Sequence, residues 1–191
     1  MPQIYKTDKT FDSQALLEVY KSLNDTSHQI MITSRGSNDL KEGVGDLRSY
    51  LTQEDVTKYK AGDTETVNRI VNLEWEWNYL HFIYKDTAME KLYECLQKDW
   101  IVGRGRFMNM DANNRALTFH NDNSIRLHVP VITNEDSWFM TEDRSMHQME
   151  ELGSLYVLDA TKKHSALMLS RNKNRVHIVF SAKERTSGVE V

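Results

Sequence analysis

The sequence has 191 residues, 39% of them hydrophobic and 27% charged, which is usual for one globular domain. Its net charge of −4 gives no overall reason to expect nucleic-acid binding, and its single cysteine, Cys95, excludes an internal disulfide framework. The N-terminal segment has no apolar signal-peptide core and no run is long enough for a membrane span, so we expect a cytoplasmic protein without a membrane partner.

Residues 1–100 are expected to be rich in helix. Apolar residues recur at 11, 15, 16, 19, 20 and 23, which is helical spacing, and Asp12 or Ser13 is suited to cap the helix. The polar segment 24–45 predicts a loop in which Ile30–Ile32 forms a short strand. Further helices are expected from Asp63 onward and over Asp86–Lys98.

Residues 74–83 are ambiguous. The aromatic residues Trp75, Trp77 and Tyr79 alternate with polar ones, and this period of two favours a strand. The alternative is that the helix starting near residue 63 continues through this segment.

From residue 100 onward the sequence predicts mostly strands. Short apolar segments alternate with turn residues, a pattern typical of two facing sheets or an open barrel. The expected strands are Arg104–Met110, Leu117–Phe119, Ile125–Ile132, Trp138–Met140, Ser154–Leu158, Ser165–Leu169 and Val176–Phe180. We therefore expect a single domain with a helix-rich part (1–100), a β core (101–182) and a flexible tail (183–191).

His120 and Asp122 are candidate metal ligands. They are two residues apart at an expected strand end, so both side chains point to the same side. Two histidines and one carboxylate form the facial triad of non-haem Fe(II) oxygenases, and His164 is the best candidate for the third ligand. The alternative is a solvated turn at 120–122 and a surface histidine at 164.

Two of the expected strands place arginine and histidine on one face. Arg126 and His128 alternate with apolar residues on one strand, as Arg175 and His177 do on the last. Arginines on a buried face need anionic partners, and a bound dicarboxylate would provide them. The alternative is that this polar face is the solvent face of an antiparallel sheet.

Six motifs resemble those of a known family in order and spacing. They are His120-Asn121-Asp122, Arg126–Asn134, His147-Gln148-Met149, Gly153–Ala160, His164-Ser165 and Arg175–Phe180. Together they resemble the Fe(II)/2-oxoglutarate dioxygenases of the aspartyl/asparaginyl β-hydroxylase group, and their pattern is most similar to the bacterial cis-proline hydroxylases. The resemblance covers about residues 104–180 and leaves the first 100 residues unmatched.

The resemblance implies an α+β protein with a double-stranded β-helix core, also called a cupin-like jelly roll, and an N-terminal part that covers one sheet. It implies iron ligation by His120, Asp122 and His164. It places Arg175 at the distal carboxylate of 2-oxoglutarate, and Arg126 with His128 near the other carboxylate. His147 matches a position near the pocket, for which we expect a structural or substrate-side role.

The implied activity is hydroxylation of an amino-acid side chain, free or in a peptide. Its cofactors would be Fe(II), 2-oxoglutarate and O₂, with ascorbate as a reductant. Two departures stand out: aspartyl β-hydroxylases carry glycine where Asp122 stands, and the segment between His164 and Arg175 is one residue longer than expected. The competing hypotheses are a non-catalytic cupin-like binding protein and a cupin metalloenzyme of another class.

Overall fold

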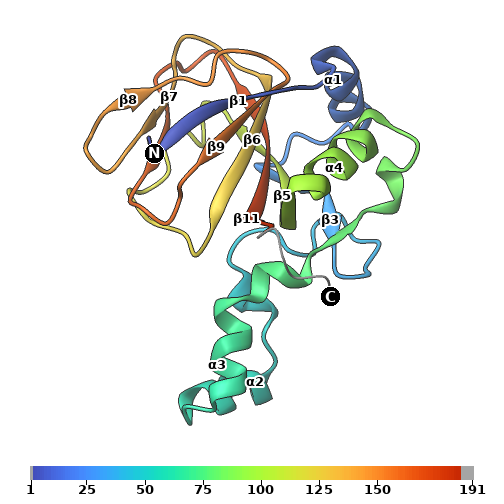
Figure 1. Ribbon diagram of the computed structural model, residues 1–191, viewed down its shortest axis with the longest axis vertical. Coiled ribbons are helices and arrows are strands. Elements are labelled where there is room, and N and C mark those ends of the chain that lie inside the picture. Colours follow the sequence, from blue (N-terminus) through green and yellow to red (C-terminus); the bar gives the residue numbers. More distant parts are fainter. Residues whose placement is uncertain (1, 186–191) are drawn as a thin grey trace.

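Two antiparallel sheets form the core of the protein in a computed structural model, which describes residues 2–185 (Figure 1). The larger sheet has six strands in the order β1 (Ile4–Thr10), β9 (Ser154–Leu158), β6 (Ile125–Ile132), β11 (Arg175–Glu184), β5 (Trp100–Met110) and β2 (Gln29–Met31). The smaller sheet contains β10 (Ser165–Met168), β7 (Ser137–Met140) and β8 (Met146–His147), and a separate pair joins β3 (Thr33–Ser34) to β4 (Tyr79–Leu80).

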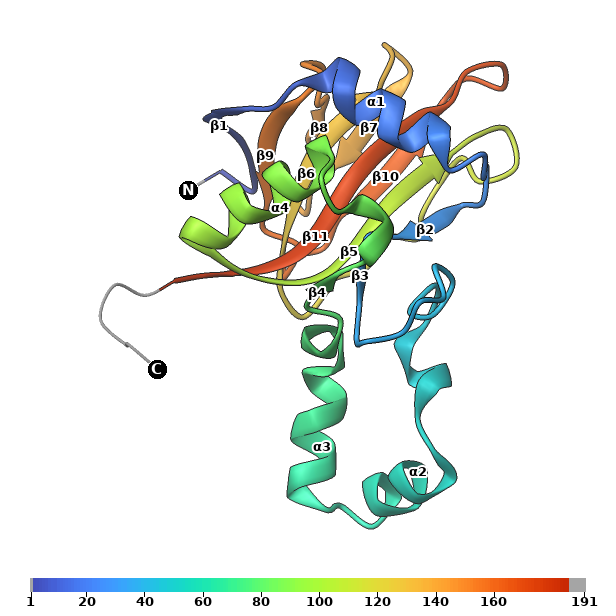
Figure 2. The same cartoon turned by 90° about the vertical axis from the view of Figure 1, so that its right-hand side faces the viewer.

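Helices α1 (Ser13–Ser22) and α4 (Ala88–Asp99) cover the outer face of the six-stranded sheet (Figure 2). Leu16 of α1 and Leu92 of α4 are fully buried in one apolar cluster with alternate residues of the central strands. Those strand residues are Leu127, Val129 and Val131 of β6, with Val176, Ile178 and Phe180 of β11. Because side chains alternate along a strand, the polar residues between them point to the other face.

That other face lies against the three-stranded sheet. A second apolar cluster fills one end of the space between the sheets, and Leu158 of β9 and Phe139 of β7 belong to it. Arg126, His128, Arg175 and His177 are all buried on the same inner face. The alternative of a solvent-facing polar surface is therefore wrong.

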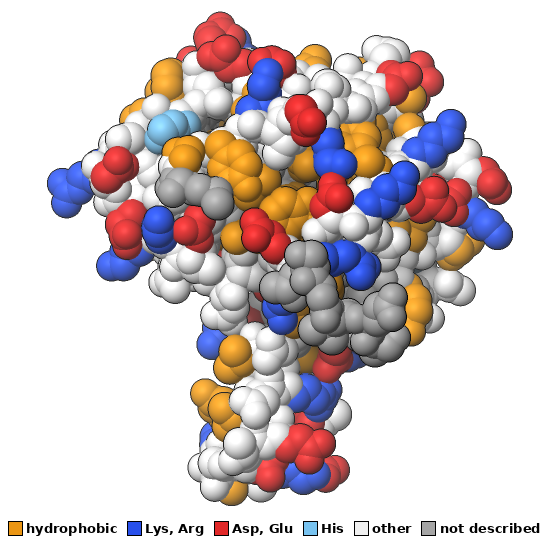
Figure 3. Space-filling model, viewed as in Figure 1, with side chains coloured by type: hydrophobic (Ala, Val, Ile, Leu, Met, Phe, Trp, Pro, Cys, Tyr) orange, Lys and Arg blue, Asp and Glu red, His pale blue; other side chains and the backbone are white. Residues whose placement is uncertain are grey.

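Residues 47–76 form a helical arm that projects away from the sheets (Figures 1 and 2). The arm contains the 3₁₀ helices η1 (Leu47–Tyr50) and η2 (Leu73–Glu76), with α2 (Gln53–Lys60) and α3 (Thr64–Val71) between them. Its base packs around Trp77 in a third apolar cluster. On the face of the arm seen in Figure 3, charged side chains of both signs lie among hydrophobic and other side chains.

Most of the expected elements are confirmed. Asp12 caps α1 by accepting a hydrogen bond from the Ala15 amide, and α4 and the long strands lie where periodicity placed them. The strand expected at 74–83 is wrong: η2 and η3 (Phe82–Tyr84) occupy half of it, and only Tyr79–Leu80 is a strand. Leu73 and Trp77, four residues apart, enter the same cluster, and this helical spacing overrides the alternation of the aromatics.

Three further features differ from expectation. Residues 117–119 form no ladder, because only isolated bridges at Ala116 and His120 join this segment to its neighbours. β1 and β2 bring residues from the helix-rich part into the main sheet. The expected tail begins inside β11, and residues 186–191 lie outside the described part of the chain.

Across residues 2–185 no helix combines the length and apolarity needed to cross a membrane.

Candidate metal centre and its cavity

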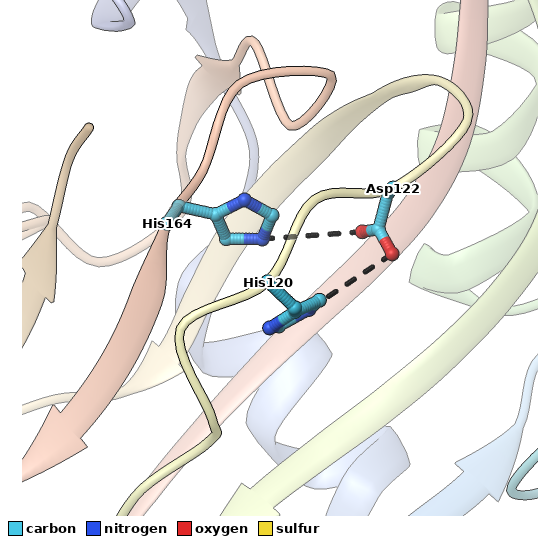
Figure 4. A group of neighbouring side chains, drawn as sticks. All are labelled: His120, Asp122 and His164. Atoms are coloured by element: carbon cyan, nitrogen blue, oxygen red, sulfur yellow. Dashed lines mark ion pairs between the residues drawn. The ribbon is translucent and has the colours of Figure 1, made fainter.

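The three predicted ligands lie together although they come from two separate loops (Figure 4). One ligand atom from each of His120, Asp122 and His164 lies within 4.8 Å of the other two. Reciprocal backbone hydrogen bonds of 3.0 and 2.8 Å join His120 to His164, and the Asp122 amide donates to the Ala160 carbonyl at 2.7 Å. The backbone therefore fixes the spacing of the ligands.

Hydrogen bonds also select the nitrogen that each histidine offers. The Nδ1 atom of His120 lies 2.5 Å from the Thr118 carbonyl oxygen, and that of His164 lies 3.0 Å from the Lys162 carbonyl oxygen. A carbonyl oxygen only accepts, so each Nδ1 carries the proton and each Nε2 keeps a lone pair. Both Nε2 atoms face the Asp122 carboxylate, each 3.9 Å from one of its oxygens.

The environment of His164 favours a neutral imidazole. Burial lowers the pKa of this histidine below its ordinary value, against a raising contribution from its backbone hydrogen bond and from Asp122. Neutral imidazole is the form that binds a metal ion. His164 is thus held in the tautomer and the protonation state of a ligand.

The three residues fit a divalent transition metal. Ligand atoms at about 2.1 Å from one ion lie about 3 Å apart when they bind at right angles. The observed separations of 3.9 Å exceed this by about 1 Å, which small side-chain rotations can close. Two imidazole nitrogens and one carboxylate leave open positions for further ligands, as in the facial triad.

The same three side chains line a cavity of about 600 Å³ between the two sheets. Arg175 reaches it from β11 and stacks on Phe139 of β7, with its guanidinium carbon 4.6 Å from the ring centre. Two of its nitrogens, Nε and Nη1, are buried without a hydrogen-bond partner among residues 2–185. Burial lowers the pKa of Arg175 to about 9, so it stays protonated at neutral pH. This cation is positioned to receive an anionic ligand.

His128 also lines the cavity, from the neighbouring strand β6. Neither of its ring nitrogens has a partner within the described chain, and burial, followed by the charge of Arg175, lowers its pKa well below the ordinary value. His177 lies on the same inner face and packs edge-on against His128, with ring centres 5.8 Å apart. Both histidines are therefore neutral.

Arg126 has a different environment from the one we expected. Its Nε lies 3.0 Å from Asp122 Oδ2, and its Nη2 lies 3.0 Å from Glu74 Oε2. Two carboxylates of the protein thus already balance its charge, whereas no carboxylate pairs with Arg175 anywhere in residues 2–185. Arg126 still lines the cavity, and its role toward a bound anion stays a prediction.

Sequence reasoning missed two further arginines of the cavity, Arg104 and Arg106 of β5. Arg104 donates to the carbonyl groups of Gly43 and Gly45, the latter at 2.7 Å. The Arg106 guanidinium is more isolated, because its one side-chain hydrogen bond in the described chain is a 3.4 Å contact to Gln29. The alternation of arginine with glycine at 104–106 was a signal that both side chains share a face.

His147 does not line the cavity. It lies on the short strand β8, half-buried, in register with Phe139 of β7. Its role stays a prediction.

No protein-family model matches the chain, and no curated protein is significantly similar to it. Several solved structures are similar. With EvdMO1 it shares 12% identity at a TM-score of 0.42, and the match covers 71% of this chain and 46% of that one. With the viral collagen prolyl hydroxylase of Paramecium Bursaria Chlorella virus-1, in its 2OG complex, it shares 9% identity at a TM-score of 0.48, and the match covers 97% of each chain. With a 2OG-Fe(II) oxygenase family oxidoreductase from Burkholderia pseudomallei it shares 13% identity at a TM-score of 0.35, and the match covers 64% of this chain and 60% of that one. The chain thus spans about half of EvdMO1, and at these TM-scores the likeness assigns no role to any residue.

Proposed function

We propose that the protein is an Fe(II)- and 2-oxoglutarate-dependent dioxygenase that hydroxylates an unactivated C–H bond of an amino-acid side chain, free or in a peptide. The observation that carries this proposal is the group of His120, Asp122 and His164 at a cavity that also holds the unpaired cation of Arg175. A metal site alone would suit many proteins. A metal site that shares a cavity with a buried guanidinium suits a cosubstrate that must reach both.

In this proposal His120, Asp122 and His164 hold the iron, and Arg175 pairs with the distal carboxylate of 2-oxoglutarate. A guanidinium forms two parallel hydrogen bonds with a carboxylate, and no carboxylate of residues 2–185 occupies Arg175. The neutral His128 lines the same wall and orients the cosubstrate by a hydrogen bond. Phe139 keeps the Arg175 guanidinium in place by stacking on it.

Bound iron would supply the chemistry in which O₂ converts 2-oxoglutarate to succinate and CO₂ and oxidises the substrate C–H bond. The protein supplies the shape and the dryness of the cavity. Its volume of about 600 Å³ has room for a five-carbon diacid together with a small substrate. The architecture of two facing antiparallel sheets agrees with the proposed double-stranded β-helix.

Anaerobic binding of 2-oxoglutarate to the Fe(II)-loaded protein tests the proposal. We expect binding to require the metal and to weaken at least tenfold in Arg175→Gln, while the affinity for Fe(II) stays unchanged. Arg171→Gln, which alters an exposed arginine on the preceding loop, is the matched control. Equal 2-oxoglutarate binding by all three proteins would remove Arg175 from this role, and a wild-type protein that binds no metal would overturn the proposed function.

A further inference from the structure

The loop that carries two of the three metal ligands lies against the helical arm. The Asn123 side chain donates to the Val71 carbonyl at the end of α3, at 3.2 Å. The Ser124 hydroxyl donates to Glu74 in η2, at 2.6 Å. A second cleft is lined by arm residues together with residues 121–123 and Arg126, and it shares Asp122 and Arg126 with the lining of the main cavity. The arm and the metal centre are therefore in direct structural contact.

A chain of charged groups runs across this contact. Glu74 of the arm binds the Arg126 guanidinium, and the same guanidinium binds Asp122 through its Nε atom. The Ser181 hydroxyl on β11 donates to Glu74 at 2.7 Å and fixes the carboxylate from the sheet side. The side chains of Glu74 and Arg126 are only 11% and 8% exposed, so water competes little with these bonds.

The titration behaviour of Glu74 agrees with this arrangement. Burial alone would raise the pKa of its carboxyl group, but the Arg126 charge and the hydrogen bonds from Ser124 and Ser181 hold the pKa below its ordinary value. Glu74 is thus ionised at neutral pH although it is buried. A buried carboxylate so fully bonded is a specific partner for Arg126 and not an incidental surface contact.

From this geometry we infer that Glu74 is a positioning residue of the metal centre, which acts through Arg126 on the ligand Asp122. The inference rests on the metal site of the proposed function. The Nε atom of Arg126 lies 3.0 Å from Asp122 Oδ2, while the Nε2 atoms of His120 and His164 lie 3.9 Å from Oδ1 and Oδ2 of the same carboxylate. Glu74 fixes the orientation of the guanidinium and balances its charge. Arg126 can therefore orient Asp122 while it competes less strongly with the metal ion for this carboxylate than an unpaired cation would.

Removal of the Glu74 charge should weaken metal binding for two reasons that act in the same direction. Arg126 would lose the ion pair that fixes its orientation. Its positive charge would then no longer be compensated by Glu74, and it would repel the metal ion and attract Asp122 away from that ion. Partners that orient metal ligands typically contribute 10- to 100-fold to affinity. We expect about a tenfold weaker metal affinity in Glu74→Gln.

The test is calorimetric titration of the full-length protein with Co(II) alone, for wild type, Glu74→Gln, Arg126→Lys and Glu76→Gln. Arg126→Lys keeps the charge but cannot bridge two carboxylates, so it should also bind about tenfold more weakly. Glu76→Gln is the matched control, because Glu76 lies in the same 3₁₀ helix but pairs with Arg69 and Arg35, away from the metal ligands. We expect wild-type Co(II) affinity in this control. In Glu74→Gln and Arg126→Lys we expect an altered Co(II) absorption spectrum.

The melting temperature of each metal-free protein separates positioning from a purely structural role. A structural role alone would lower this temperature and leave the Co(II) affinity and spectrum unchanged, and that result for folded Glu74→Gln would overturn the inference. If Glu74→Gln does not fold, Ser181→Ala keeps all charges and removes one bond to Glu74. A several-fold loss of affinity there supports the inference, and wild-type affinity overturns it. A wild-type protein that binds no Co(II) would instead contradict the proposed function.

Discussion

Four buried arginines line the cavity, and they differ in what neutralises them. Arg126 is paired with two carboxylates, and Arg104 donates to two backbone carbonyls. The Arg106 guanidinium makes one hydrogen bond within residues 2–185, a 3.4 Å contact to Gln29, and neither Nε nor Nη1 of Arg175 has a partner there. A buried charge without a partner destabilises the folded state, so these two side chains are retained at a cost in stability. Such a cost is typical of residues that serve binding.

Replacement of Arg106 should therefore stabilise the protein. Arg106→Met keeps the apolar part of the side chain and removes an almost unpartnered charge, and we expect a gain on the order of 1 kcal/mol in the free energy of unfolding of the ligand-free protein. Urea denaturation measures it. Arg104→Met is the control and should lower the free energy of unfolding, because the carbonyl groups of Gly43 and Gly45 would lose their hydrogen bonds to Arg104. A loss of stability in Arg106→Met would show that its guanidinium is well satisfied.

The clustering of His120, Asp122 and His164 could be predicted because they stand in motifs that resemble those of a known family, whereas their local spacing alone left other readings open. His120 and Asp122 form one short motif, and His164 follows in a second motif with its own turn residues. Glu74 could not be predicted, because its role depends on how the arm packs against the loop at 121–124. The same holds for Gln29, which meets Arg106 only through the pairing of β2 with β5. Arg126 shows the limit of motif reasoning: its position on the inner face was right, but its pairing with Glu74 depends on the packing of the arm.

At the scale of elements, periodicity predicted the buried strands and missed the elements that bury little. β1 is an edge strand of the large sheet in which only Ile4 is buried, so its sequence carries no apolar alternation. α2 has no buried residue at all, and capping by Thr52 and Asp55 is its main sequence signal. Elements of this kind form because their neighbours are in place, which a single sequence does not reveal.

Strand β5 carries two of the arginines that line the cavity. Gly105 lies between Arg104 and Arg106, and a Cβ atom at this position would overlap the Phe180 ring on the adjacent strand β11. Gly105→Ala should lower the free energy of unfolding by about 1–3 kcal/mol, because an overpacked core must shift.

The double variant Gly105→Ala/Phe180→Leu tests this cause. Leucine leaves space where the ring lies, so the double variant should be more stable than the sum of the two single losses predicts. Urea denaturation of the four proteins gives the coupling free energy. Strict additivity would show that the overlap with Phe180 does not destabilise Gly105→Ala.

At the scale of the whole molecule, the helical arm is attached to the sheets through its base. The cluster of Met31, Leu47, Leu73 and Trp77 forms this base, and the Trp77 indole donates to the Glu42 carbonyl at 2.9 Å. α2 and α3 pack on each other beyond it, away from the sheets (Figure 2). The arm should therefore open locally, without unfolding of the sheets.

Trp77→Ala should loosen the arm selectively. Truncation of a fully buried tryptophan costs about 3–5 kcal/mol, and the lost contacts lie at the base of the arm. We expect faster amide hydrogen exchange in α2 and α3, with exchange in β6 and β11 nearly unchanged. Mass spectrometry of peptides from both regions gives the comparison. Equal acceleration in the sheet strands would show that the arm and the core unfold as one unit.

Conversion of 2-oxoglutarate to succinate tests the central claim most directly. With Fe(II), O₂ and a panel of amino acids and peptides, the wild-type protein should form succinate, with a rate that rises when the true substrate is present. His120→Ala lacks one ligand of the centre and should form none above the level of free Fe(II). If wild type and His120→Ala are equally inactive over the whole panel, and neither binds iron, the protein is not a 2-oxoglutarate-dependent dioxygenase.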